Sequence, residues 1–383
     1  MKDKVVVHLI ASMVDRMGPS EGILAHICAA SETQPGYEHQ VVSMYDPPAG
    51  FEMWDKLSAA GIKYHRLNAD SIWDIRALYR LVVLLRSNEA VILHCHLYRA
   101  NIYGRFASLF VHRLNNISTL RGVEDYMRCA GLKFWTARLI ERLSAPLTDS
   151  YIAVSRGVLE AAVESLRIKR EKVKVVLNAA DTSLSLIDRS ELRMHIRNRF
   201  GISDETVVVG SAASMDARKN PVFFVNVAKA VCEKCDNVYF LWAGAGPDEP
   251  TVKKIVKELR LEDRVRFIGF EKNIALFLSS LDIFSLFSRA EGLSRAMMEA
   301  MMIGLPCLVS NVSGVDDSIK NMETGIIVEQ GDLEGAVKAI MRLSEDTSLR
   351  KKIGQRAKDV STERFSPKRL ASQYNSIYND MLT

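Results

Sequence analysis

Two glutamates, Glu291 and Glu299, are separated by seven residues in a stretch that is otherwise mainly apolar. The preceding segment, residues 281–287, is short, apolar and rich in β-formers, which predicts a buried strand of a parallel sheet. A loop then leads to Ser294, a good N-cap for a helix that Gly304 would end. Because this helix is apolar on every side, we expect it to be buried.

The two carboxylates lie at the start of this helix and about one turn below it. A carboxylate at Glu299, inside a buried helix, is costly unless something hydrogen-bonds it. Glu291 precedes the helix start at Gly292, Leu293 and Ser294, where free backbone N–H groups attract anions. Carboxylates accept hydrogen bonds from sugar hydroxyls, so the stretch predicts a nucleotide-sugar site. The plainer alternative is that Glu299 meets a core arginine and Glu291 is solvated.

The sequence around the two glutamates resembles the motif of a known family. Glu-Gly-Leu-Ser-x4-Glu-Ala from Glu291, followed by Gly-Leu-Pro, looks like the signature of the retaining glycosyltransferases of family 4, which have the GT-B fold. The resemblance implies two doubly wound, Rossmann-like α/β domains facing across a cleft. It also implies transfer of a sugar from a nucleotide donor to an acceptor hydroxyl. In that picture Glu299 holds the ribose, and Glu291 is catalytic, meeting the sugar hydroxyls and steadying positive charge on the ring.

Other expected donor-binding residues follow from the same resemblance. Lys219 matches a lysine that neutralises the donor diphosphate, whereas Ser214 stands where the family usually has an arginine. Arg218, next to Lys219, is a candidate to compensate. Phe270 follows a strand whose outgoing turn holds the nucleotide base in family members. Gly18 lies in the loop after the first strand, where α/β folds bind phosphate or sugar, although the family usually has two glycines there.

The N-terminal half supplies the remaining candidates. Arg121 occupies the place of a family histidine that touches the donor sugar, so it is the second catalytic candidate, although an arginine cannot accept a proton. His94 and His96 end a predicted strand, where ligands of α/β folds bind, and are candidates for acceptor binding. A core role and a metal site remain alternatives for them, with Cys95 pointing to the opposite side.

Length and composition limit the possible classes of protein. Strands and helices alternate through the 383 residues, which predicts two domains: residues 1–182, with a last helix 367–383 crossing back, and residues 183–366. A net charge of +5, spread along the chain, does not indicate nucleic-acid binding. The sequence has no Asp-x-Asp, so we expect neither a metal nor another cofactor. Cys232-x-x-Cys235 lacks a second ligand pair for zinc, and Gly244-x-Gly246 lacks the rest of a dinucleotide fingerprint.

The sequence also bears on the cellular location and the acceptor of the protein. Residues 1–4 lead straight into a strand rather than a signal peptide, which favours a cytoplasmic protein. Residues 132–143 form a basic amphipathic helix, and two interpretations remain open: it lies on the inner, anionic membrane surface, or it packs on its own domain. Family habit suggests a glycan or lipid-linked acceptor in surface polysaccharide or lipopolysaccharide synthesis. Because of the departures at Pro19, Arg121 and Ser214, a non-catalytic nucleotide-sugar-binding protein is the alternative, and a nucleotide-sugar epimerase a further one.

Overall fold

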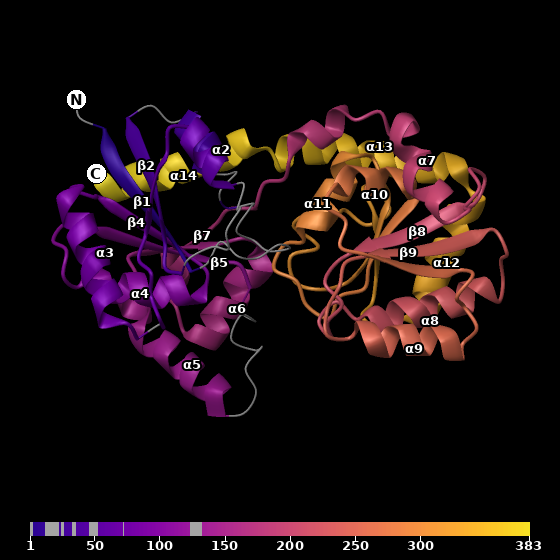
Figure 1. Cartoon of the computed structure of the whole chain (residues 1–383), viewed down its shortest axis with the longest axis horizontal. Helices are drawn as coiled ribbons and strands as arrows, with labels where there is room; N and C mark the ends of the chain where they lie inside the picture. Colours follow the sequence, from indigo (N-terminus) through magenta and orange to yellow (C-terminus); the bar gives the residue numbers. More distant parts are fainter. Residues whose placement is uncertain are drawn as a thin grey trace. The chain divides into compact units, whose positions relative to one another are not determined.

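The computed structural model describes residues 3–11, 23, 27–32, 36–45, 53–71, 73–122 and 132–383. The chain divides into two compact units: unit 1 is Met1–Ala179 with Pro367–Thr383, and unit 2 is Ala180–Ser366. Each unit is built on one parallel sheet with helices around it, so the predicted pair of Rossmann-like α/β domains is confirmed (Figure 1).

The sheet of unit 1 has seven parallel strands in the order β3-β2-β1-β4-β5-β6-β7. The strand order reverses between β1 and β4, and such a switch point is where doubly wound sheets bind ligands. The strands are β1 (Lys4–Ile10), β2 (Tyr37–Ser43), β3 (Lys63–Arg66), β4 (Ile92–His96), β5 (Asn115–Leu120), β6 (Ser150–Ala153) and β7 (Val173–Val175). The described helices are α2 (Met53–Ala59), α3 (Ile75–Ser87), α4 (Tyr98–Ser108), α5 (Leu132–Ser144), α6 (Arg156–Leu166) and α14 (Pro367–Leu382).

The two faces of this sheet have separate cores. Alternation along β4 sends Leu93 and Cys95 into a core shared with α3 and α4. Ile92 packs instead with residues of α14, the last helix of the chain. Arg369 of that helix also donates a hydrogen bond to the backbone oxygen of Leu177 (2.9 Å), which fixes its start to unit 1.

The sheet of unit 2 has six parallel strands in the order β10-β9-β8-β11-β12-β13, with its switch point between β8 and β11. The predicted strand over 281–287 is β11, and the predicted buried helix is α11. The strands are β8 (Val207–Ala212), β9 (Val238–Ala243), β10 (Val265–Gly269), β11 (Ile283–Leu286), β12 (Cys307–Ser310) and β13 (Ile326–Val328). The helices are α7 (Arg189–Arg199), α8 (Pro221–Cys232), α9 (Glu249–Glu258), α10 (Ile274–Ser280), α11 (Arg295–Met302), α12 (Leu333–Glu345) and α13 (Thr347–Arg364).

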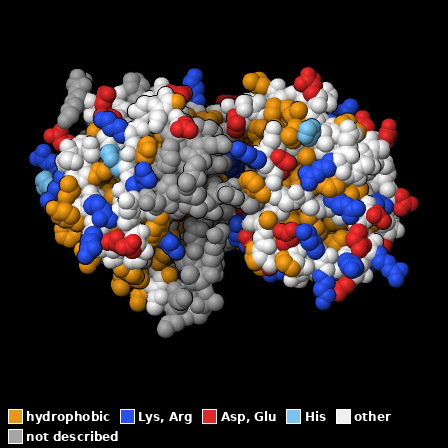
Figure 2. All heavy atoms as spheres, in the orientation of Figure 1, with side chains coloured by type: hydrophobic (Ala, Val, Ile, Leu, Met, Phe, Trp, Pro, Cys, Tyr) orange, Lys and Arg blue, Asp and Glu red, His pale blue; other side chains and the backbone are white. Residues whose placement is uncertain are grey.

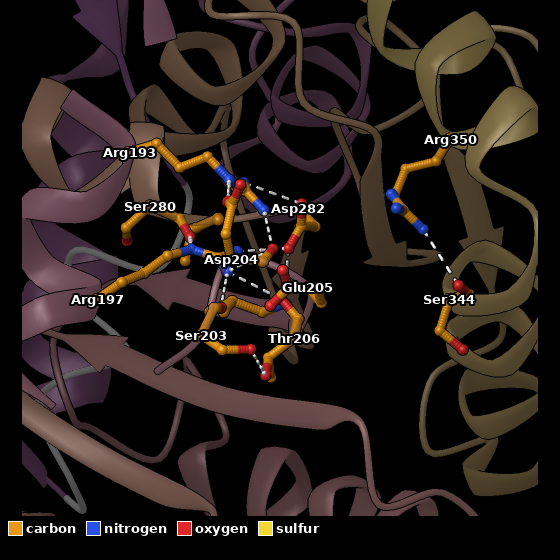
Figure 3. A network of polar contacts seen from close by, with 12 residues as sticks. Arg193, Arg197, Ser203, Asp204, Glu205, Thr206, Ser280, Asp282, Ser344 and Arg350 are labelled. Atoms are coloured by element: carbon orange, nitrogen blue, oxygen red, sulfur yellow. Dashed lines mark hydrogen bonds and ion pairs between the residues drawn. The ribbon is translucent and has the colours of Figure 1, made fainter. Parts of the chain in front are cut away.

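A buried network of charges fixes the beginning of β11 (Figure 3). Arg197 of α7 is fully buried and pairs with Asp282, with 2.6 Å between Nη2 and Oδ2. Arg193 pairs with the other oxygen of Asp282 at 3.0 Å, and the backbone N–H of Val208 in β8 donates to Oδ2 at 2.8 Å. The network joins α7 to both strands of the switch point, so it positions the strands from which the site loops leave.

Candidate active site

The loops that follow β8 and β11 meet at an ion-paired carboxylate. The buried Glu291 accepts hydrogen bonds at Oε1 from the ammonium of Lys219 and from the hydroxyl of Ser288, the latter at 2.6 Å. Its other oxygen, Oε2, lies 3.6 Å from Nη1 of Arg218. Two cations from one loop therefore face one carboxylate from the neighbouring loop, at the switch point of the sheet.

Ser214 shapes the loop that presents these cations. Its hydroxyl donates to Oδ2 of Asp216 (2.7 Å), while the backbone N–H groups of Arg218 and Lys219 donate to Oδ1 (3.0 and 3.1 Å). Burial alone would raise the pKa of Asp216, but these hydrogen bonds and the two cations outweigh it and lower the pKa. Asp216 is therefore held as a carboxylate around which the loop folds.

The start of α11 is formed as the sequence predicts. The hydroxyl of Ser294 accepts a hydrogen bond from the backbone N–H of Met297 (3.4 Å), which confirms Ser294 as the N-cap. Glu299 is buried, and its Oε1 accepts a hydrogen bond from Nε of Arg295 at 2.7 Å. Arg295 is partly exposed and lies one turn before Glu299 on the same helix, so it is a site-edge residue rather than the core arginine of the alternative.

A small hollow lies beside these groups. It is lined by residues of the β11 and β12 ends and of the α11 start, among them Glu291, Leu293, Ser294, Met297 and Ser310. The hydroxyl of Ser313 donates to the backbone oxygen of Glu291 at 3.0 Å, which closes the loop containing Gly292 on this side. The structure thus brings the predicted residues of both loops to one place. Gly18 lies outside the described residues.

Phe270 lies further along the same edge of the sheet. It directly follows β10 and is half exposed, after Gly269, whose φ of 75° favours glycine. The neighbouring strand, β9, ends in a loop that packs closely on the Lys219 loop: a Cβ at Gly246 would stand 2.3 Å from the backbone oxygen of Met215. The sequence analysis did not predict this close packing, although the Gly-x-Gly pattern at the end of β9 is a signal for it.

Among the candidate site residues of unit 1, His94 lies in the core, whereas His96 and Arg121 line a hollow. His94 is fully buried, and its ring nitrogens bond Tyr378 of α14 (2.7 Å) and Thr119 of β5 (2.6 Å), so the structure favours the core alternative over acceptor binding. His96 and Arg121 line a second hollow together with His8 and Tyr374. The guanidinium of Arg121 also donates to the side chain of Asn178 at 2.9 Å.

His94 and His96 belong to a cluster of four histidines beneath α14, two of which the sequence analysis missed. His8 bonds His96 through Nδ1 (3.1 Å) and His39 through Nε2 (3.0 Å). Burial, followed by the neighbouring imidazoles, lowers the pKa of His8 well below its usual value. Burial lowers the pKa of His39 to about 4, and burial with Arg121 lowers that of His94 to about 3. His8, His94 and His96 come close enough to hold a metal, but these hydrogen bonds occupy the nitrogens of His8 and His94.

Fold and site define a class of protein: two Rossmann-like domains, one of which has a helix start beside paired cations and carboxylates. The family models "Glycosyl transferases group 1" and "Glycosyltransferase Family 4" match residues 193–360 and 26–184. The chain therefore belongs to the family 4 glycosyltransferases of GT-B fold, a class of transferase enzymes.

Several known proteins are similar to it. The N-acetyl-alpha-D-glucosaminyl L-malate synthase of Bacillus anthracis is 28% identical over 63% of this chain and 62% of that protein, so the match spans less than two thirds of that relative. The UDP-Gal:alpha-D-GlcNAc-diphosphoundecaprenol alpha-1,3-galactosyltransferase of Escherichia coli is 26% identical over 74% of this chain and 73% of its own. The crystal structure of Anabaena HepE in complex with UDP and glucose superposes with a TM-score of 0.82, at 18% identity, over 98% of this chain and 100% of that one. This similarity confirms the GT-B fold.

Proposed function

We propose that this protein is a retaining glycosyltransferase that moves a sugar from a uridine-diphosphate donor to a hydroxyl of a glycan or lipid-linked acceptor in surface polysaccharide synthesis. The observation that carries the proposal is the meeting of Lys219, Arg218 and Glu291 beside the start of α11. The choice of uridine is supported by HepE, whose structure contains UDP, and by the Escherichia coli relative, whose name specifies UDP-Gal.

The donor would exchange partners with the ion pair that occupies the site. A diphosphate brings negative charge to the loop after β8, where Lys219 and Arg218 are the available cations and the α11 N–H groups the available donors. Once Lys219 turns to phosphate, Glu291 loses its strongest partner and becomes an acceptor for sugar hydroxyls. Charge developing on the ring would then lie near a carboxylate in a poorly solvated site, where such stabilisation is largest.

Glu299 is proposed to hold the ribose. Its Oε1 accepts a hydrogen bond from Arg295, and a carboxylate has about four acceptor positions, so Glu299 can also accept a hydrogen bond from a hydroxyl. No protein nucleophile is proposed: the acceptor would attack from the side of the leaving diphosphate, whose oxygen takes the acceptor proton. For the acceptor side, the hollow lined by His96 and Arg121 is the candidate in unit 1.

The test starts from binding and continues to turnover. Unfolding midpoints are measured with UDP, GDP and ADP, and sugar transfer or donor hydrolysis is then measured with UDP-sugars. A ligand that binds only the folded state raises the midpoint, so we expect a shift with UDP that is lost in Glu299→Ala and kept in Glu334→Ala, an exposed control on α12. Glu291→Gln should bind UDP but lose turnover. Binding without turnover by the unmodified protein would instead favour the nucleotide-sugar-binding alternative, and no binding would refute the site.

A further inference from the structure

Helices α3, α4 and α5 lie in succession on unit 1 and expose an unusual number of apolar side chains. Contacts join α3 to α4 and α4 to α5. We call the outer surface of these helices the α3–α5 face. We count with it the residues within two positions of the helix ends, and most of the large apolar side chains exposed in the described part of the chain then belong to it: Trp73, Ile75, Tyr79, Val83, Leu109, Phe110, Trp135, Leu139 and Leu143. In Figure 2 apolar side chains gather along the left and lower edges of unit 1, where Figure 1 places α3 and α5.

The exposed residues form stripes that the core of unit 1 does not use. On α3, Ile75, Tyr79 and Val83 follow one another every four residues, which places them on one side of the helix. The opposite side of the same helix, including Leu81 and Leu85, is already buried in the core. Trp135, Leu139 and Leu143 repeat the spacing on α5. Large exposed apolar patches usually mark an interaction surface.

Positive charge exceeds negative charge on the helices of the α3–α5 face, although Asp74, the N-cap of α3, lies 4.0 Å from Arg80. Helix α3 contains Arg76, Arg80 and Arg86 and no acidic residue. Helix α5 contains one acidic residue, Glu141, which is buried against the guanidinium of Arg105 at 2.7 Å. Two helices of unit 2, α9 and α12, instead pair lysine with glutamate one turn apart, as in Lys253–Glu249. On α3 and α5 the positive charge therefore lies beside the exposed apolar stripes.

We propose that the α3–α5 face docks unit 1 on an anionic membrane surface. Apolar stripes flanked by arginines match such a surface, since the side chains enter the headgroup boundary while the guanidinium groups meet lipid phosphates. Trp73 and Trp135 are suited to that boundary, because an indole is apolar in its body and polar at its N–H. A second copy of the chain is the poorer partner, because it would oppose the same positive charges. No helix of the described residues is long and apolar enough to cross a bilayer.

The test uses the full chain and lipid vesicles without any donor or acceptor. Flotation is compared for phosphatidylcholine vesicles and for vesicles that also contain phosphatidylglycerol. We expect binding to the anionic vesicles, weakened by salt. The double variant Ile75→Gln with Leu139→Gln should bind at least about tenfold more weakly, and Arg76→Gln about fivefold. All three positions are exposed, so the fold should persist. The controls Leu186→Gln and Lys351→Gln, at exposed positions of unit 2, should bind normally.

Three results would overturn the proposal. They are equal binding to neutral and anionic vesicles, unchanged binding by the double variant, and absence of binding to either vesicle. Dimerisation that the double variant abolishes, measured by light scattering, would overturn it in favour of a contact between copies. Because vesicle binding requires no turnover, an inactive protein that still floats with anionic vesicles would refute the proposed function and leave this inference standing.

Discussion

Acidification should loosen unit 1 at pH values where most carboxylates are still ionised. His8, His39 and His94 are buried under α14 with depressed pKa values, whereas in the unfolded chain each titrates near 6.5. Below pH 6.5 the unfolded chain therefore binds protons that the folded chain does not. The free energy of unfolding must fall as the pH falls, from about 6.5 down to the folded pKa values.

The size of this effect follows from the shifts. For His39 the difference between 6.5 and about 4 corresponds to about 3 kcal/mol. Each imidazole that stays neutral contributes about 1.4 kcal/mol per pH unit, so the three together contribute about 4 kcal/mol per unit. Domains are stable by only about 5–15 kcal/mol, so a unit 1 at the lower end of this range should open near pH 5 (roughly).

Hydrogen–deuterium exchange can follow this loss in unit 1 alone. The amides of α14 around Tyr374 and Tyr378 report on the helix that covers the cluster. After correction for intrinsic exchange, their protection should fall steeply between pH 6.5 and 5. In His39→Gln about one proton fewer should be taken up on opening, so protection should fall less steeply with pH. Glutamine can still donate a hydrogen bond to His8 but does not titrate. His112→Gln, at an exposed histidine of the same unit, is the matched control. Protection that is constant over this range, or an equal slope in His39→Gln, would refute the reasoning.

Three further changes test the site and its support in unit 2. Lys219→Ala should weaken UDP binding at least about tenfold by calorimetry, with the exposed Lys229→Ala as control; equal affinities would contradict the role of Lys219. Gly246→Ala should destabilise unit 2 by about 1–3 kcal/mol in urea unfolding, since its Cβ would meet the Met215 backbone; an unchanged midpoint would contradict this. Arg197→Ala should lower the free energy of unfolding of unit 2 by about 3–5 kcal/mol, because Asp282 loses its buried partner. The surface control Lys351→Ala should lower it by less, and similar losses in the two variants would contradict the role of Arg197.

Much of the site around α11 could be predicted because its signals are local. A β-prone run, a capping serine, an apolar helix and a stopping glycine follow one another from residue 281 to Gly304, and the structure forms β11 and α11 there. Local geometry also determines that Glu291 and Glu299 lie at the helix start and one turn later. The pairing of Arg295 with Glu299 was not predicted, although their spacing of four residues on one helix is a signal for such an ion pair.

The histidine cluster shows what sequence alone could not give. His8 and His94 are cross-strand neighbours in the register of β1 and β4, and His39 comes from β2 on the other side of β1. These contacts depend on strand order, which the sequence does not state. The cover over them comes from α14, whose Tyr378 lies 284 residues beyond His94. The strand order and the cover by α14 together make His94 a core histidine and not a residue of the cleft.

Ser214 shows how a departure from a family pattern can change in meaning once the structure is known. From sequence it removes one of two cations that would meet the donor diphosphate. In the structure it donates to Asp216, and Asp216 holds the backbone N–H groups of Arg218 and Lys219. Arg218 then lies 3.6 Å from Glu291, on the same carboxylate as Lys219. The site therefore still contains two cations, and Ser214 fixes the loop that presents them, which is why we favour a donor-binding site over a degenerate one.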